Sequence, residues 1–132
     1  MRKIILGATL PAAALTALML SAGAAPAQEA TLYKTPQCGC CENYADHLRE
    51  NGFEVTVKPT HDLPSINREA GLPEEFAGCH TMFIDGYAIS GHVPVDTVRK
   101  VLDESPAIKG ITLPGMPMGS PGQCFGILPG EP

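Results

Sequence analysis

Basic residues are scarce in this sequence of 132 residues. Nine lysines and arginines stand against 14 aspartates and glutamates, which gives a formal net charge of −5 at pH 7. An acidic surface repels the phosphates of nucleic acids, and we therefore expect no nucleic acid partner. The imbalance is compatible with binding of cations, although net charge alone selects none of them.

Long hydrophobic runs are also missing, with one exception at the start of the chain. The positive head Met1–Lys3 precedes an apolar run from Ile4 to Leu20, and Ala25-Pro26-Ala27 has the small residues of a cleavage site. This order is typical of a secretory signal peptide, which we predict to span residues 1–27. A retained membrane anchor is the alternative, because the run approaches the ~20 residues that span a bilayer. We expect cleavage, a periplasmic location and no membrane association afterwards.

Removing 27 of the 132 residues leaves 105, which is enough for one small domain with a single core. Hydrophobic periodicity predicts the following elements, in chain order: a strand at 30–33, a helix at 40–51, a strand at 53–58, a helix at 63–70, a turn or short helix near 73–76, strands at 81–84 and 87–90, and a helix at 95–104. Asp85-Gly86 is a two-residue hairpin signal, and two strands separated by a helix imply a parallel pair.

The order of these elements predicts an α/β fold. We expect one thioredoxin-like metal-binding domain over residues 28–132, with a small mixed four-stranded sheet and flanking helices. After Gly110 the chain becomes rich in proline and glycine, and we expect an irregular tail there.

The five cysteines lack the even number and wide spacing of a disulfide scaffold. Cys38, Cys40 and Cys41 crowd into "CGCC", where bonds between neighbours are strained, so a structural disulfide is the weaker explanation for the cluster. Two interpretations remain open. Cys38 and Cys41 have the C-x-x-C spacing of redox enzymes, whereas Cys38 and Cys40 have a C-x-C spacing that suits one soft metal ion.

The cluster lies where the first strand meets the first helix. A helix N-terminus stabilises thiolates, and we expect Cys38 exposed in the turn, Cys41 facing inward and Cys40 between them. In thioredoxin-like folds the loop before the third strand lies against this turn. Here that loop carries Cys79-His80, a thiol and an imidazole, which favours metal binding over plain disulfide exchange.

Two methionines, Met116 and Met118, lie in the Pro/Gly-rich stretch "LPGMPMGSPG" without a periodic apolar face. Thioethers together with thiolates suit Cu(I). We do not expect the remaining methionine and histidines to bind metal. Met82 is expected in the core, His92 in a structural role, and His47 and His61 facing solvent. Cys124 has no assigned role.

Three segments of the chain resemble a domain-of-unknown-function family that includes the periplasmic copper-resistance protein CopG. They are "LYKTPQCGCCENYADHLRENGFEV", "LPEEFAGCHTMFIDGYAISGHVP" and "KGITLPGMPMGSPG". The resemblance implies a thioredoxin-like fold that holds a cysteine-bridged copper cluster and acts in copper handling, including interconversion of Cu(I) and Cu(II). It implies seven metal ligands: Cys38, Cys40, Cys41, Cys79, His80, Met116 and Met118. The chain departs from the family where Gln123-Cys124 replaces a methionine.

Three functions therefore compete. The first is a periplasmic protein that binds copper as Cu(I) in a thiolate site with several ions, in copper resistance or copper redox handling, with other periplasmic copper-handling proteins as partners. The second is a thiol–disulfide oxidoreductase in which Cys38 attacks and Cys41 resolves. The third is a structural zinc module, since four sulfur donors satisfy tetrahedral zinc.

Overall fold

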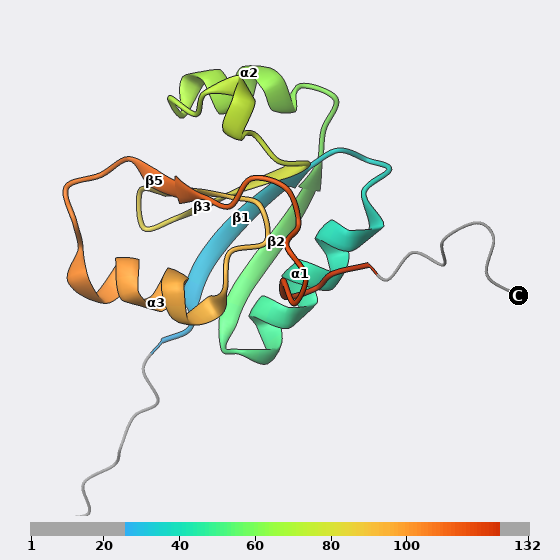
Figure 1. Ribbon diagram of the computed structural model, residues 1–132. Coiled ribbons are helices and arrows are strands. Elements are labelled where there is room, and N and C mark those ends of the chain that lie inside the picture. Colours follow the sequence, from blue (N-terminus) through green and yellow to red (C-terminus); the bar gives the residue numbers. More distant parts are fainter. Residues whose placement is uncertain (1–25, 125–132) are drawn as a thin grey trace, which may run out of the picture.

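A computed structural model describes residues 26–124 of the chain, so the predicted signal peptide lies almost wholly outside these residues. A five-stranded mixed sheet forms the centre of the fold (Figure 1). Its strands run in the order β2-β1-β3-β4-β5. Their bounds are β1 Gln28–Lys34, β2 Phe53–Pro59, β3 His80–Ile84, β4 Tyr87–Ser90 and β5 Gly110–Thr112.

The pairing within the sheet is parallel at both edges and antiparallel in the middle. β1 pairs with β2, and β4 with β5, in parallel, whereas β3 is antiparallel to both β1 and β4. Each parallel pair is connected through a helix, as the length of such a crossover requires.

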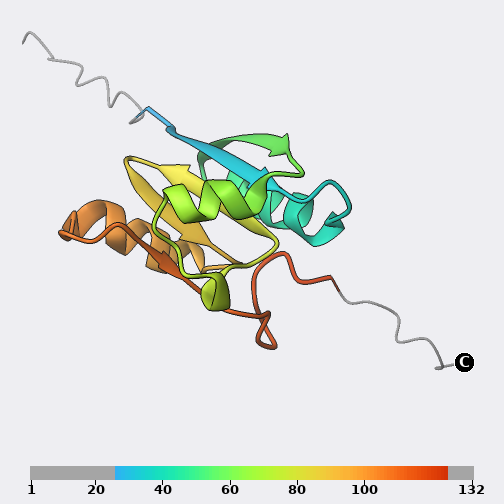
Figure 2. The same cartoon turned by 90° about the horizontal axis from the view of Figure 1, so that it is seen from above.

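Helices cover both faces of the sheet (Figures 1 and 2). α1 (Gly39–Glu50) and α3 (Val95–Glu104) lie on one face, and α2 (Leu63–Glu69) lies on the other, followed by the 3-10 turn η1 (Glu74–Phe76). The main core lies between the sheet and helices α1 and α3. It contains Leu32, Cys41, Tyr44, Ala45, Leu48, Met82, Ile84, Ile89, Val98 and Leu102, among others.

The structure confirms the α/β class and the predicted order of elements, but the prediction of four strands was wrong. β5 is a fifth strand of three residues at the sheet edge, paired with β4 from Ala88 to Ser90. Such a short segment has no alternation to detect, and it begins where the chain becomes rich in proline and glycine. Its first residue, Gly110, lies so close to the backbone of Ala88 that a Cβ atom would overlap it.

None of the helices between residues 26 and 124 has the length and apolar run required to cross a bilayer.

We expect Gly110→Ala to destabilise the protein, because the added methyl group forces β5 away from β4. The expected loss in the free energy of unfolding is about 1–3 kcal/mol, the usual cost of overpacking, as measured by urea denaturation of the metal-free protein. Gly39→Ala is the control, since a Cβ there meets no atom within 4 Å. Equal stability of the two variants would contradict the close approach of β5 to β4.

Candidate metal centre

The register of β1 against β3 brings the two cysteine segments together. Lys34 at the end of β1 lies opposite His80 at the start of β3. One residue beyond this pair, the backbone N–H of Thr35 donates to the carbonyl of Cys79 at 3.1 Å, and the N–H of Cys38 donates to the carbonyl of Thr35 at 3.1 Å. Cys79 therefore lies against the CGCC turn, as the sequence predicted.

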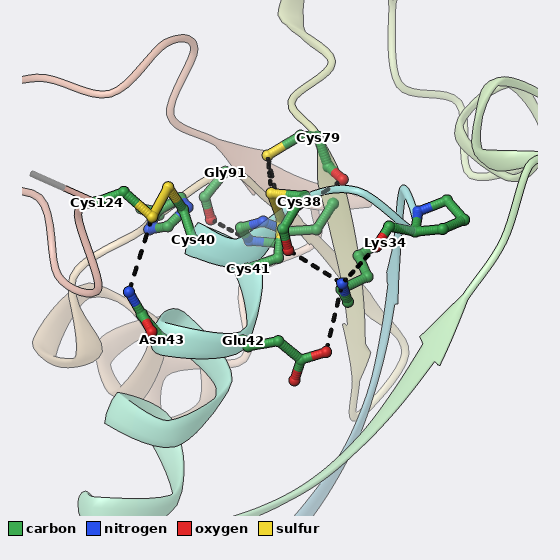
Figure 3. The surroundings of a disulfide bond; sticks show 12 residues. Lys34, Cys38, Cys40, Cys41, Glu42, Asn43, Cys79, Gly91 and Cys124 are labelled. Carbon is green, nitrogen blue, oxygen red and sulfur yellow. Dashed lines mark hydrogen bonds and ion pairs between the residues drawn. A yellow bond between two sulfur atoms is a disulfide. The ribbon is translucent and has the colours of Figure 1, made fainter. Parts of the chain in front are cut away.

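Three sulfur atoms converge at this point (Figure 3). Cys38, the N-cap of α1, forms a disulfide with Cys41, which is fully buried in the first turn of the helix. The Sγ of Cys79 lies 3.0 Å from that of Cys38 and 3.2 Å from that of Cys41. Cys79 is the free cysteine of the chain, and it is half-buried. Reduction of the disulfide leaves three thiols within ligand distance of one metal ion.

Cys40, by contrast, is bonded elsewhere. It forms a second disulfide with Cys124, which lies 84 residues later in the tail, and this bond lies apart from the three sulfurs in Figure 3. The sequence had ranked structural disulfides below metal binding, yet the structure holds four of the five cysteines in disulfides. In this oxidised form the sulfur of Cys40 is not free to bind a metal.

Three aromatic rings pack behind the sulfurs. Tyr44 on α1, His80 on β3 and His92 just after β4 are all buried, with each pair of ring centroids 5.0 Å apart. The hydroxyl of Tyr44 donates to the carbonyl of Val93 at 2.7 Å, which satisfies the polar end of this side chain. Each histidine ring is therefore packed against the other and against Tyr44.

Backbone carbonyls fix the tautomers of both histidines. A carbonyl only accepts, so the Nε2–H of His80 donates to Gly91 at 3.0 Å and the Nδ1–H of His92 donates to Pro121 at 2.7 Å. The opposite nitrogens, Nδ1 of His80 and Nε2 of His92, are buried without a partner among the described residues. Burial, followed by the charge of His92, lowers the pKa of His80 to about 4, so this ring is neutral near pH 7.

A buried cation lies next to the thiols. Lys34 is 4% exposed, and its Nζ donates to the carbonyls of Cys38 at 3.0 Å and Pro36 at 3.4 Å, with Glu42 at 3.4 Å as its ion-pair partner. Burial raises the pKa of the Cys79 thiol, while a hydrogen bond from its own backbone and the positive charge of Lys34 act in the opposite direction. Lys34 thus favours the thiolate form of Cys79, against the larger effect of burial.

The methionines predicted as ligands lie in a different environment. Met118 is 86% exposed and Met116 is half-buried, and neither packs against the core cluster that Cys38 and Cys79 join. Met82 is fully buried, as the sequence predicted for a core residue. His61 is exposed, also as predicted, whereas His47 is half-buried.

Sequence reasoning did not assign His92 and Lys34 to the site. A signal for His92 was nevertheless present in the predicted hairpin. The turn at Asp85-Gly86 pairs Thr81 with Ser90. Two residues further along the same register, Cys79 lies opposite His92. No sequence pattern indicated that Lys34 lies at the site, since a lysine at the end of a strand is common.

Comparison with known proteins identifies the relatives of this chain. Residues 76–123 match the family described as "Protein of unknown function, DUF411". Two solved structures of the copper resistance protein CopG, titled form 1 and form 2, are each 35% identical to the chain with a TM-score of 0.70. The matches cover 79% and 77% of this chain, and 82% of the CopG chain in both cases. The chain belongs to the CopG family.

No curated protein sequence matches this CopG-family chain. The chain combines a cluster of Cys38, Cys41 and Cys79 with an adjoining cluster of Cys79, His80 and His92. Sulfur and imidazole nitrogen are ligands that copper accepts in proteins, and the two clusters are therefore compatible with copper binding.

The disulfides lead to a prediction about thiol counts. Alkylation of the oxidised, metal-free protein under denaturing conditions is expected to label one of the five cysteines, Cys79. Cys124→Ser leaves Cys40 without a partner, so mass spectrometry is expected to find two labels, on Cys40 and Cys79. Unchanged labelling of this variant, or labelling of Cys38 or Cys41 instead, would contradict the pairing.

Proposed function

We propose that this chain is a periplasmic copper-binding protein that holds Cu(I) in a thiolate site with several ions and acts in copper resistance or copper redox handling. Cleavage of a signal peptide at residues 1–27 and a single thioredoxin-like domain over residues 28–132 are part of the proposal. The metal ligands are Cys38, Cys41, Cys79 and His80, with Cys40, Met116 and Met118 as further donors in the reduced protein.

The convergence of three sulfurs carries this proposal. The Sγ of Cys79 comes from a strand, those of Cys38 and Cys41 come from the start of a helix, and the distances from Cys79 to the other two are 3.0 and 3.2 Å. Thiolates bind monovalent copper strongly because both are soft, and one sulfur can bridge two ions. Similarity to a copper resistance protein over most of the chain supports the choice of copper over other soft metals.

Copper binding by these thiolates requires the reduced protein. Two electrons and two protons convert the Cys38–Cys41 disulfide into two thiols, and each thiol then loses its proton when it binds a metal. The N-terminus of α1 and the buried ammonium group of Lys34 favour the thiolate forms. Reduction of the second disulfide adds Cys40, which lies next to Cys41 in the chain.

The oxidoreductase remains the second candidate, because the structure contains a C-x-x-C disulfide at a helix start. The third thiol argues against it. Cys79 lies within 3.2 Å of both sulfurs, where it competes in any disulfide exchange. Rapid reduction of insulin by the metal-free protein would favour this candidate. A structural zinc site ranks last, because zinc rarely binds the thioethers in the proposed ligand set.

Binding of Cu(I) to the fully reduced protein tests the proposal. In anaerobic competition with a chromogenic Cu(I) chelator, we expect more than one Cu(I) per chain. Replacement of Cys38, Cys41 or Cys79 with serine is expected to weaken binding more than about tenfold, since even the loss of a supporting outer-shell contact costs that much.

Cys124→Ser is the matched control, because Cys124 is outside the proposed ligand set and its replacement should leave Cu(I) affinity unchanged. Equal affinity of the Cys79→Ser and Cys124→Ser variants would refute a site centred on Cys79. Met116→Leu and Met118→Leu determine whether the thioethers belong to the ligand set.

A further inference from the structure

One cluster next to the thiols has its own donor set. The sulfur of Cys79 and one ring nitrogen each of His80 and His92 all lie within 4.8 Å of one another. His80 and His92 are 0% and 1% exposed, whereas Cys79 is half-buried. Cys79 belongs to both clusters, so the two donor sets adjoin through this one sulfur.

The histidines are oriented as metal ligands usually are. A metal-binding imidazole typically donates its other N–H to a carbonyl or carboxylate, which fixes the ring and its tautomer. His80 does so to Gly91 and His92 does so to Pro121. These bonds leave the lone pairs on Nδ1 of His80 and Nε2 of His92, the two buried nitrogens without a partner. A buried polar atom without a partner is costly, and a bound ion would remove that cost.

The tail contributes to this arrangement through its backbone. Pro121 supplies the carbonyl for His92, and Gly122 lies so close to the backbone of Asn43 and Tyr44 that a Cβ atom would overlap it. The Cys40–Cys124 disulfide ties the same segment to α1 two residues later. The described part of the tail therefore fixes the orientation of His92 through a backbone carbonyl.

The geometry points to a second copper site, in which Cys79, His80 and His92 bind one Cu(II) ion while Cys38 and Cys41 are joined in a disulfide. This inference rests on the proposed function, because it adds a ligand set next to the proposed Cu(I) site. Two imidazoles and one thiolate are a ligand set that proteins use for copper. The oxidised protein keeps these three donors after it has lost two thiols of the Cu(I) site. Binding releases the proton of the Cys79 thiol and requires no electron transfer.

Titration of the oxidised protein with Cu(II) tests the inference. One equivalent is expected to saturate an intense visible band from thiolate-to-copper charge transfer, and electron paramagnetic resonance is expected to show coupling to two imidazole nitrogens. Co(II), which thiols do not reduce, serves as a parallel probe and is expected to give a sulfur-to-cobalt band. The inference is overturned if neither ion gives a charge-transfer band, or if fewer than two imidazoles couple to Cu(II). These outcomes are read from the wild-type protein alone.

Variants assign the ligands. His92→Asn retains a donor for the carbonyl of Pro121 but removes the unpartnered Nε2, and it is expected to weaken Cu(II) binding at least about tenfold. Cys79→Ser is expected to abolish the band. His61→Ala, at an exposed histidine, is the matched control and should leave it unchanged. A folded His92→Asn protein with wild-type affinity and an unchanged band would exclude His92 as a ligand.

The double variant Cys38→Ser/Cys41→Ser separates this inference from the proposed function. It removes two thiols of the Cu(I) site but keeps all three donors of the Cu(II) site, so the band is expected to persist. Loss of the band in a folded double variant would overturn the inference. Failure of the wild-type protein to bind Cu(I), with the band intact, would overturn the proposed thiolate site alone.

Discussion

The antiparallel pairing of β1 with β3 determines where the sulfur atoms of this protein meet. Lys34 opposite His80 is the last pair of this ladder, and the chain leaves it in two directions, into the CGCC turn and into the Cys79 loop. The hydrogen bond from Thr35 to Cys79 continues the pairing by one step. A shift of one residue would exchange the side chains on the two faces of β3 and separate Cys79 from α1.

The same register supplies the buried groups around the sulfurs. It directs His80 into the core beside Tyr44, and β4 then brings His92 next to both rings. The carbonyl oxygens of Gly91 and Pro121 fix the two imidazoles. The candidate ligands and the carbonyls that orient them thus come from four stretches of the chain. The disulfide from Cys40 to Cys124 ties the last of these stretches to α1.

Much of this arrangement was predictable from local pattern, because the helices and the longer strands have clear periodicity. The convergence of Cys79 on the CGCC turn followed from the order of elements. β5 was not predictable, since three residues beginning with Gly110 show no alternation. The partner of Cys40 was also beyond prediction, because 84 residues separate it from Cys124 and only the folded tail brings them together. His92 is an intermediate case, since the hairpin register predicts its position but not the orphaned nitrogen that makes it a ligand candidate.

Anomalous diffraction at the copper edge, from crystals of the reduced protein loaded with Cu(I), measures most directly whether the β1–β3 register creates a copper site. We predict that the strongest copper peak lies within bonding distance of the Sγ of Cys79 and of at least one of Cys38 and Cys41. Copper bound only away from Cys79, for example on the methionines of the tail, would contradict it.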